Sequence, residues 1–181
     1  MIDLSKFHSI VFDFDGVFTD NYAFVDENSI ESVRVSRADG YGIDLLRKFC
    51  SIKGLNLSIL ILSTERNKVV SARANKLNLE CISGERNKLQ ALKKRFEIER
   101  PHDSNPLSGL IYFGNDLNDM AVMLEAGLSI APADAHIKIK EISTHVLNCQ
   151  GGQGFVREGV EFLIDIASMS PEEISEFVSN S

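Results

Sequence analysis

The chain has 181 residues, 44% hydrophobic and 25% charged, and its formal net charge is −7. This acidic balance argues against a nucleic-acid partner, because phosphate backbones attract basic surfaces, and no apolar run reaches the ~18 residues needed to span a membrane. The three cysteines, Cys50, Cys81 and Cys149, are far apart and predict neither a zinc site nor a disulfide framework, so we expect one cytoplasmic domain covering residues 1–181 with free thiols.

Short apolar runs alternate with longer amphipathic segments along the chain, a pattern typical of a parallel β-sheet with crossover helices. The predicted strands cover residues 9–14, 57–63, 81–83, 109–113 and 128–131, with another near 146–147. The predicted helices cover residues 41–50, 67–77, 87–96, 119–126 and 157–167. The predicted fold class is therefore α/β with a parallel central sheet.

The stretch "NYAFVDENSIESVRVS", residues 21–36, breaks this alternation and predicts two strands around the turn residues Asp26, Glu27 and Asn28. A β-hairpin is thus expected between the first strand and the first helix. Its unpaired edges are either covered by a partner chain or belong to a plain two-stranded extension at the edge of the fold.

Three further segments are marked by glycine or proline. In "RADGYGIDLLRKF", Asp39 is the predicted N-cap of a helix, and Gly40 and Gly42 allow another backbone to approach closely. The glycine-rich segment 151–155 is either a mobile or anion-binding loop or a plain turn before the last helix. The tail, residues 170–181, has a proline at a helix-start position and predicts a short surface helix.

Four short signals fall at the C-terminal ends of predicted parallel strands, where open α/β sheets bind their ligands. They are, in chain order, Asp13-x-Asp15-Gly16, the pair Ser63 and Thr64, Lys88, and "GNDLND" at residues 114–119. Each alone is weak, since an acidic pair before glycine is often only a turn and a lone lysine is usually a surface residue. All four in this order indicate one site.

The chemistry of phosphate-ester hydrolysis accounts for this set. Asp13 and Asp15 lie two residues apart on an extended strand, so they point the same way about 6–7 Å apart and would repel without a cation between them. Mg²⁺ held there would bring an anionic phosphate to Asp13, the predicted nucleophile. Asp15, with its pKa raised by burial, would serve as general acid and base. Lys88 would neutralise the phosphoryl oxygens, and Ser63 and Thr64 would bind them.

"DFDGVFTD", a serine at a strand end, the lysine and "GNDLND" together resemble the haloacid dehalogenase-like (HAD) phosphohydrolase superfamily. "DGVFTD", "RADGYGIDLL", "NKL", "AVMLEAGLSIAPADAH" and "GGQGFVRE" are similar to the 3-deoxy-D-manno-octulosonate 8-phosphate phosphatase family. That similarity extends to nonulosonate 9-phosphate phosphatases and to the C-terminal domains of some acylneuraminate cytidylyltransferases, and it covers residues 7–166.

The resemblance implies a HAD-like Rossmannoid three-layer sandwich with a β-hairpin inserted after the first strand and no separate cap domain. It also implies a Mg²⁺-dependent phosphatase that acts on a phosphorylated sugar acid, in lipopolysaccharide or sialic acid biosynthesis, through an aspartyl-phosphate. The hairpins are expected to pack together at the centre of a homotetramer, so that a neighbouring subunit covers each active site.

Two positions bear on the substrate. Glu65 stands two residues after Ser63, where the octulosonate branch typically has arginine, and Lys76 follows on the next predicted helix. The pair resembles the nonulosonate branch, in which Glu65 would bind hydroxyl or amide groups and Lys76 the substrate carboxylate. The alternative is a solvent-exposed ion pair on a helix.

The sequence departs from the family pattern at Asn115, which stands where the metal-binding motif has aspartate. Either Asn115 coordinates the metal with Asp119 in support, or Asp116 takes its place. Spacing favours Asn115, because a four-residue step puts it and Asp119 on one helical face. The alternative function is a non-catalytic oligomerisation or regulatory domain related to the cytidylyltransferase C-terminal regions, although this chain keeps the nucleophile that such domains can lose.

Overall fold

A central sheet and a projecting hairpin organise the computed structural model, which describes residues 2–179. Its strands are β1 (Ser9–Phe12), β2 (Thr19–Val25), β3 (Glu31–Val35), β4 (Ser58–Leu62), β5 (Glu80–Ile82), β6 (Leu110–Phe113), β7 (Leu128–Ala131) and β8 (His145–Val146). Its helices are α1 (Arg37–Lys53), α2 (Lys68–Lys76), α3 (Lys88–Glu99), α4 (Met120–Glu125), α5 (Ile137–Ile142), α6 (Phe155–Ile164) and α7 (Pro171–Ser179). Short 3-10 turns are η1 (Leu4–Lys6), η2 (Pro106–Gly109) and η3 (Ile166–Ser168).

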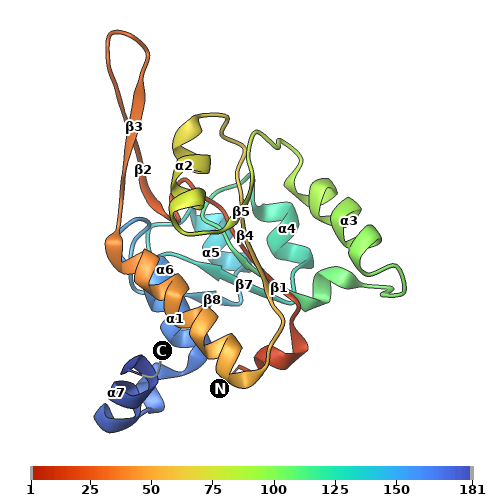
Figure 1. Ribbon diagram of the computed structural model, residues 1–181. Coiled ribbons are helices and arrows are strands. Elements are labelled where there is room, and N and C mark those ends of the chain that lie inside the picture. The colour runs from red at the N-terminus through yellow and green to blue at the C-terminus, as the bar shows by residue number, and fades with distance from the viewer. Residues whose placement is uncertain (1, 180–181) are drawn as a thin grey trace.

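Within the described residues, six strands form one parallel sheet in the order β5-β4-β1-β6-β7-β8 (Figure 1). The central strand β1 pairs Ile10 with Ile59 of β4 and with Ile111 of β6. The chain first builds the sheet on the β4 side of β1 and then crosses to the β6 side. Such a reversal of strand order beside β1 marks the place where open α/β sheets bind ligands.

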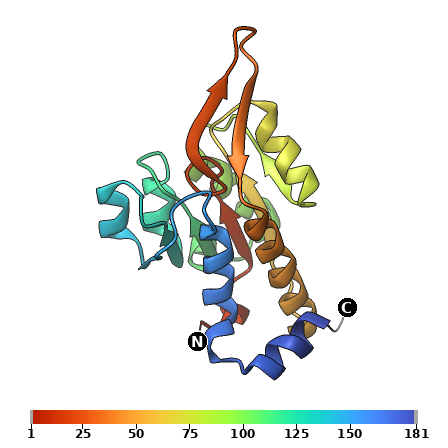
Figure 2. The ribbon, with the colours of Figure 1, turned by 90° about the vertical axis from the view of Figure 1, so that its left-hand side faces the viewer.

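Helices cover both faces of this sheet. Ile10 and Phe12 of β1 join one core with side chains of α1, α2 and α6, whereas Val11 joins a second core with side chains of α3, α4 and α5. Figure 2 shows α1 and α6 side by side on the first face. The two-residue alternation of a strand thus divides the apolar side chains between two helical layers, which confirms the expected three-layer sandwich.

Most boundaries differ slightly from the predicted ones, although β7 coincides with its predicted range. β1 ends two residues earlier than predicted, because the chain folds into a tight turn after it. In that turn the carbonyl of Phe14 accepts the amides of Phe18 (2.9 Å) and Thr19 (3.2 Å), and Gly16 adopts a left-handed φ of 75°. Two residues of the apolar run therefore leave the strand and begin the loop that holds the acidic pair.

The prediction of Asp39 as a helix N-cap is wrong. α1 begins four residues before the predicted range, and Ser36 is its N-cap, accepting the amide of Ala38 at 3.1 Å. Asp39 lies buried in the first turn, where its Oδ1 accepts the amide of Arg157 from α6 at 3.0 Å. The predicted close approach is confirmed at Gly42, where an added Cβ would lie 3.0 Å from the Cα of Arg157.

The predicted hairpin is present as the antiparallel pair β2–β3, and it projects from the body of the fold (Figures 1 and 2). The predicted turn is confirmed, because Asp26 Oδ1 accepts the amides of Asn28 (2.9 Å) and Ile30 (2.8 Å). Large apolar side chains of the hairpin are exposed to solvent: Tyr22 (75%), Phe24 (68%), Val25 (63%) and Ile30 (64%).

Helices near the C-terminus add one element that was not predicted. α5 is only one and a half turns long, too short for a helical period to show in the sequence. The surface helix predicted for the tail is α7, and residues 180–181 of that tail lie outside the described residues. Within residues 2–179, no helix is long and apolar enough to cross a membrane.

The segment predicted as a glycine-rich loop, residues 151–155, packs against the turn that follows β1. Gly151 donates its amide to Asp134 Oδ1 (3.0 Å), and Gly152 donates its amide to the carbonyl of Val17 (3.0 Å). Because these amides already have partners, the anion-binding interpretation of the segment is wrong at these two residues. The three cysteines are free thiols, with Cys50 buried and the other two partly buried.

Candidate active site

The C-terminal ends of three neighbouring strands bring the predicted polar residues to one edge of the sheet. Asp13 follows β1, Ser63 follows β4 and Asn115 follows β6, on either side of the central strand. A cavity of about 430 Å³ opens at this edge. It is lined by Asp13, Asp15, Asn21, Thr64, Asn115, Asp116, Leu117 and Asn118.

A buried lysine joins two carboxylates beneath this cavity. Lys88, the first residue of α3, places its Nζ 2.7 Å from Asp13 Oδ1 and 2.7 Å from Asp119 Oδ1. All three side chains are buried. The Lys88 ammonium therefore contacts two carboxylates. When both are ionised, these three side chains together carry one negative charge that Lys88 does not balance.

The pKa values of Asp13 and Lys88 reflect this excess of negative charge. Burial raises the pKa of Asp13 far above its ordinary value, the charge of Asp119 raises it further, and Lys88 opposes both. Burial by itself would lower the pKa of Lys88, but the two carboxylates outweigh it and hold that pKa above its ordinary value. A second cation near Asp13 would favour the ionised carboxylate.

Asp119 also holds the loop that follows β6. Its Oδ1 accepts the hydroxyl of Tyr112 at 2.7 Å, and its Oδ2 accepts the amides of Asn115 (2.9 Å) and Asp116 (3.3 Å). The prediction that Asn115 and Asp119 share a helical face is wrong, because α4 begins only at Met120 and the residues before it form a turn. The two residues are adjacent because the carboxylate accepts the loop amides.

Asn115 presents a buried oxygen without a partner. Its side chain lies against Gly16, where an added Cβ would come within 1.9 Å of Asn115 Nδ2. Its Oδ1 is buried and has no hydrogen-bond partner among residues 2–179. Asp116, in contrast, is exposed, and its Oδ1 accepts the amide of Leu117 at 2.7 Å.

These groups fit a hard divalent cation. No three His, Cys, Asp or Glu side chains within residues 2–179 form a metal-binding cluster. Mg²⁺, however, is commonly bound by one or two carboxylates, with water and substrate phosphate completing its shell. Asp13 and the unpaired amide oxygen of Asn115 would supply such oxygen ligands, and the excess of carboxylates over ammonium groups around Lys88 would favour a cation.

Asp15 lies half-buried at the rim of the cavity. Burial raises its pKa, the nearby charges of Glu65 and Glu31 raise it further, and a hydrogen bond from Thr19 lowers it. That bond runs from Thr19 Oγ1 to Asp15 Oδ1 at 3.3 Å. A carboxyl group with a raised pKa beside the cavity keeps its proton to higher pH than a free aspartate does, which suits it to proton transfer.

The residues after β4 differ in their exposure and in their contact with the cavity. Ser63 is buried, and its hydroxyl oxygen accepts the amide of Glu65 at 3.0 Å. The hydroxyl proton of Ser63 therefore remains available for a hydrogen bond to a ligand. Thr64 lines the cavity. Glu65 is exposed, and its Oε1 accepts the amides of Arg66 (2.6 Å) and Asn67 (2.9 Å), so this oxygen is engaged by its own loop.

Lys76 is not brought to this site within the chain. It is the last residue of α2, which runs from the C-terminal end of β4 back to the N-terminal end of β5. Because β4 and β5 are parallel, the end of α2 lies at the opposite edge of the sheet from Ser63. Lys76 is exposed there.

Two residues of the site did not emerge from the sequence. Tyr112 lies within the apolar run of β6, and the only signal for it was that a buried tyrosine hydroxyl needs a hydrogen-bond partner. Asn21 lines the cavity from β2, and its position at the start of the predicted hairpin carried no signal for a site residue.

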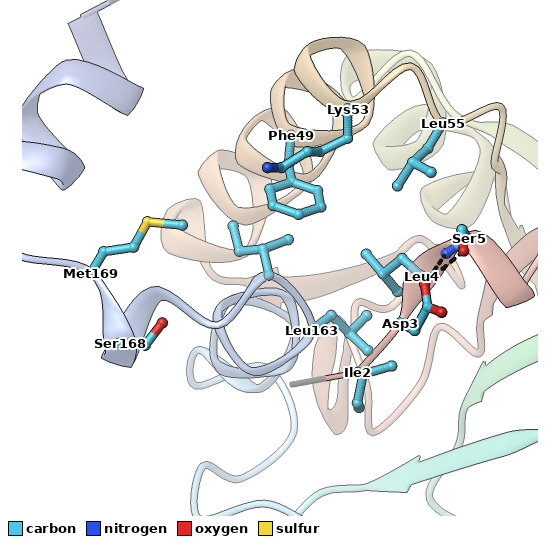
Figure 3. A pocket seen from close by; sticks show the side chains of 11 residues that line it. Ile2, Asp3, Leu4, Ser5, Phe49, Lys53, Leu55, Leu163, Ser168 and Met169 are labelled. Atoms are coloured by element: carbon cyan, nitrogen blue, oxygen red, sulfur yellow. Dashed lines mark hydrogen bonds between the residues drawn. The ribbon is translucent and has the colours of Figure 1, made fainter.

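A second cavity, of about 450 Å³, lies at the N-terminal side of β1, away from these groups (Figure 3). Its lining is mostly apolar, with Phe49, Leu55 and Leu163 among the side chains that face it. Its carboxylate, Asp3, is already bonded to the amide (3.1 Å) and the hydroxyl (2.6 Å) of Ser5. Lys53 also lines this cavity, but no ion pair joins it to Asp3 within the described residues, so the buried lysine–carboxylate cluster of the strand ends has no counterpart here.

Comparison with known proteins agrees with this geometry. The model of the haloacid dehalogenase-like hydrolase family matches residues 58–157, a range that includes Ser63, Lys88 and Asn115. The chain is 31% identical over 156 residues to the 3-deoxy-D-manno-octulosonate 8-phosphate phosphatase KdsC of Salmonella typhi, with 86% of this chain and 78% of the relative aligned.

Solved structures share the fold over most of the chain. The 3-deoxy-D-manno-octulosonate 8-phosphate phosphatase of Yersinia pestis is 28% identical with a TM-score of 0.76, covering 91% of this chain and 83% of its own. The phosphatase of the same name from Moraxella catarrhalis, solved with magnesium ion, phosphate ion and KDO, is 22% identical with a TM-score of 0.81, covering 97% of this chain and 94% of its own. At that identity the second likeness concerns the fold alone.

Proposed function

The chain belongs to the haloacid dehalogenase-like hydrolase family as a phosphatase of the KdsC type, and we propose that its substrate is 3-deoxy-D-manno-octulosonate 8-phosphate. The identity to KdsC across most of both chains supports this sugar acid. A nonulosonate 9-phosphate would be favoured instead by the resemblance of Glu65 and Lys76 to the nonulosonate branch. The local hydrogen bonds of Glu65 and the distant position of Lys76 give that preference no support.

The contact between Lys88 and Asp13 is the observation that carries the proposal. The two side chains meet at 2.7 Å at the end of β1, and Asp13 lines the cavity in which a phosphate could lie. The Asp13 carboxylate can attack phosphorus there. The Lys88 ammonium can neutralise the phosphoryl oxygens while the phosphoryl group moves from the sugar oxygen to Asp13. The buried Ser63 hydroxyl, which follows β4 and keeps its proton to donate, would bind the same oxygens.

Hydrolysis would proceed in two steps through an aspartyl-phosphate. An oxygen of Asp13 forms a bond to phosphorus while the bond from phosphorus to the sugar oxygen breaks, and Asp15 gives its proton to that leaving oxygen. Water then attacks the aspartyl-phosphate, Asp15 takes a proton from it, and the bond between Asp13 and phosphorus breaks to release phosphate. The raised pKa of Asp15 supports this pair of roles.

Asp13 and Asn115 would hold Mg²⁺ between β1 and β6, with Asp15 and Asp116 at the rim and Asp119 fixing the loop. When bound, Mg²⁺ would neutralise charge between the carboxylates and the phosphate. The unpaired Oδ1 of Asn115 supports it as a ligand ahead of Asp116, whose Oδ1 already accepts an amide. A neutral amide oxygen binds Mg²⁺ less strongly than a carboxylate does.

Calorimetric titration tests the metal assignment without using turnover. Asn115→Asp is expected to bind Mg²⁺ more tightly than the wild type, and Asn115→Ala more weakly. A Mg²⁺ affinity unchanged in Asn115→Ala would remove this residue from the ligand set.

The substrate is tested by comparing kcat/KM for 3-deoxy-D-manno-octulosonate 8-phosphate and for nonulosonate 9-phosphates. The octulosonate is expected to be preferred, and a clear nonulosonate preference would contradict the proposal. Asp13→Asn, which keeps the side-chain shape, is expected to abolish turnover. The matched control is Asp44→Asn, on the exposed side of α1, which is expected to stay within about two-fold of the wild type.

The exposed apolar side chains of the hairpin support the proposed homotetramer. Tyr22 and Phe24 on β2 are each more than two-thirds exposed in one chain, and their burial against other copies would be favourable. Tyr22→Ser combined with Phe24→Ser is expected to lower the mass observed by sedimentation velocity. A wild-type chain that sediments as a monomer at every concentration would refute the assembly.

A further inference from the structure

Asn21 faces the candidate active site from the hairpin side of the cavity. It lines the same space as Asp13, Asp15 and Asn115, but it belongs to β2 and not to a strand of the central sheet. It is exposed, and its carboxamide has no hydrogen-bond partner in the described part of the chain, residues 2–179. This amide is therefore available to a molecule in the cavity.

The backbone at Asn21 is in an unusual conformation. Its φ is 64°, in the left-handed region that residues other than glycine seldom adopt. The register of the β2–β3 pair shifts between Thr19 and Ala23, so Asn21 lies in a β-bulge or a similar irregularity of the pairing. Bulges turn a side chain away from the regular alternation of a strand and are frequent beside active sites.

A single hydroxyl links this bulge to the acidic pair. Thr19 Oγ1 accepts the amides of Gly16 (3.2 Å) and Asn21 (3.2 Å), and it donates to Asp15 Oδ1 (3.3 Å). The position of the Asn21 backbone is thus tied to the carboxyl group proposed as the proton donor. A substrate that contacts Asp15 would therefore lie beside the hydrogen bonds by which Thr19 links Asp15 to Asn21.

The glycine-rich segment supports the bulge from the other side. An added Cβ at Gly151 would lie 2.1 Å from the carbonyl oxygen of Gly16, and one at Gly152 would lie 2.4 Å from the carbonyl carbon of Thr19. Two backbones therefore pack with no room for a side chain between them. In addition, Asp20 forms an ion pair with Arg34 across the hairpin at 2.7 Å. These contacts hold the strained conformation in place.

We propose that the Asn21 carboxamide binds the organic part of the phosphorylated substrate and contributes to its selection; this rests on the proposed phosphatase function. With the phosphoryl group beside Asp13 and Lys88, the rest of the substrate extends toward the mouth of the cavity. A carboxamide both donates and accepts hydrogen bonds, so it matches the hydroxyl groups and carboxylate of a sugar acid. Being neutral, it adds no repulsion to that of Asp15 and Asp116.

Asn21→Gly removes the carboxamide while suiting the left-handed backbone, because glycine adopts positive φ without strain. The matched control is Asn78→Gly, which makes the same change at another left-handed asparagine (φ 50°), next to the C-cap of α2 and away from the cavity. Each protein is assayed with 3-deoxy-D-manno-octulosonate 8-phosphate and with p-nitrophenyl phosphate, and its folding is checked by circular dichroism.

For Asn21→Gly we expect kcat/KM on the sugar-acid phosphate to fall at least ten-fold, mainly through KM, and the preference over p-nitrophenyl phosphate to fall with it. Asn21→Asp is expected to lose more, since it adds a negative charge facing an anionic substrate. Asn78→Gly is expected to stay within two-fold of the wild type.

An Asn21→Gly protein within two-fold of an active wild type on the sugar-acid phosphate overturns this inference alone. A wild type that hydrolyses no sugar-acid phosphate overturns the proposed substrate, and this inference with it. The two failures are therefore distinguished by the wild-type assay.

Discussion

Replacing Tyr112 with phenylalanine tests the buried hydrogen-bond network under the active site. The change removes one hydroxyl from a fully buried side chain and leaves the ring that packs in the second core. The hydroxyl donates to Asp119 Oδ1 at 2.7 Å, and burial together with the charges of Asp119 and Asp13 keeps its pKa well above the ordinary tyrosine value. The tyrosine is therefore a permanent donor to a charged acceptor.

The size of the effect follows from this geometry. A hydrogen bond to a charged group contributes about 1.5–3 kcal/mol to stability. Asp119 Oδ1 keeps Lys88 as a second donor, so the variant does not leave it without a partner. We expect Tyr112→Phe to lower the free energy of unfolding by about 1.5–3 kcal/mol, which for a chain of this length corresponds to a fall in Tm of roughly 3–12 °C.

Urea unfolding followed by far-ultraviolet circular dichroism measures this change, because the chain has no tryptophan and the variant alters tyrosine fluorescence. Protein concentration is kept constant so that association does not shift the result. Tyr41→Phe is the matched control: Tyr41 is 44% exposed, and its hydroxyl has no hydrogen-bond partner within residues 2–179. We expect the control to change stability by less than about 0.5 kcal/mol, and a similarly small change in Tyr112→Phe would refute the network.

Three further changes probe burial, charge and packing. Burial raises the pKa of Asp39 from 3.8 to about 6. The free energy of unfolding that depends on its proton is therefore fully present below pH 3.8 and is lost as the pH rises through 6. Relative to the wild type, Asp39→Asn should gain about 3 kcal/mol in free energy of unfolding between pH 4 and 7, measured by urea unfolding. Lys88→Met, which leaves buried carboxylates without their ammonium, should lower the free energy of unfolding by about 3–5 kcal/mol and abolish turnover in the phosphatase assay. Gly151→Ala should lower the Tm well below that of Gly54→Ala, because its Cβ would overlap the Gly16 carbonyl at 2.1 Å, whereas Gly54 has nothing within 4 Å.

Each of these expectations has an opposing outcome. A constant difference between the Asp39→Asn and wild-type unfolding free energies across the pH range would contradict the raised pKa of Asp39. Turnover retained in Lys88→Met would remove that residue from the proposed chemistry. Equal Tm values for the two glycine variants would mean that the glycine-rich segment does not need its close backbone approach.

Local patterns were sufficient for most of the fold. A parallel strand buried on both faces reads as a short apolar run, and β7, at Leu128–Ala131, was predicted residue for residue on that basis. The ends of elements were less certain because they depend on hydrogen bonds. Ser36 caps α1 because its side chain accepts a backbone amide of the first turn. The hydrophobic periodicity of the helix does not identify such a capping residue. The short helix α5 left no periodic signal at all.

The strand-end rule also predicts most of the candidate site from the sequence. Asp13, Ser63 and Asn115 each follow an apolar run, and parallel strands bring their C-terminal ends to one edge. Lys76 was predicted as a substrate contact from the family resemblance and not from the strand-end rule. Within one chain α2 runs back along the sheet and carries Lys76 to the other edge.

The sequence by itself determined which segments form strands and which polar residues end them, because those features depend on neighbours a few positions away. Only the tertiary structure decided which of these residues meet. Lys88 and Asp119 are 31 positions apart and touch because α3 and the loop after β6 pack at the same edge of the sheet. Tyr112 joins the site through a buried hydrogen bond to Asp119, seven positions along the chain, and Asn21 joins it through an irregularity in the β2–β3 pairing. Both contacts depend on how the chain folds after a strand, which the apolar pattern does not encode.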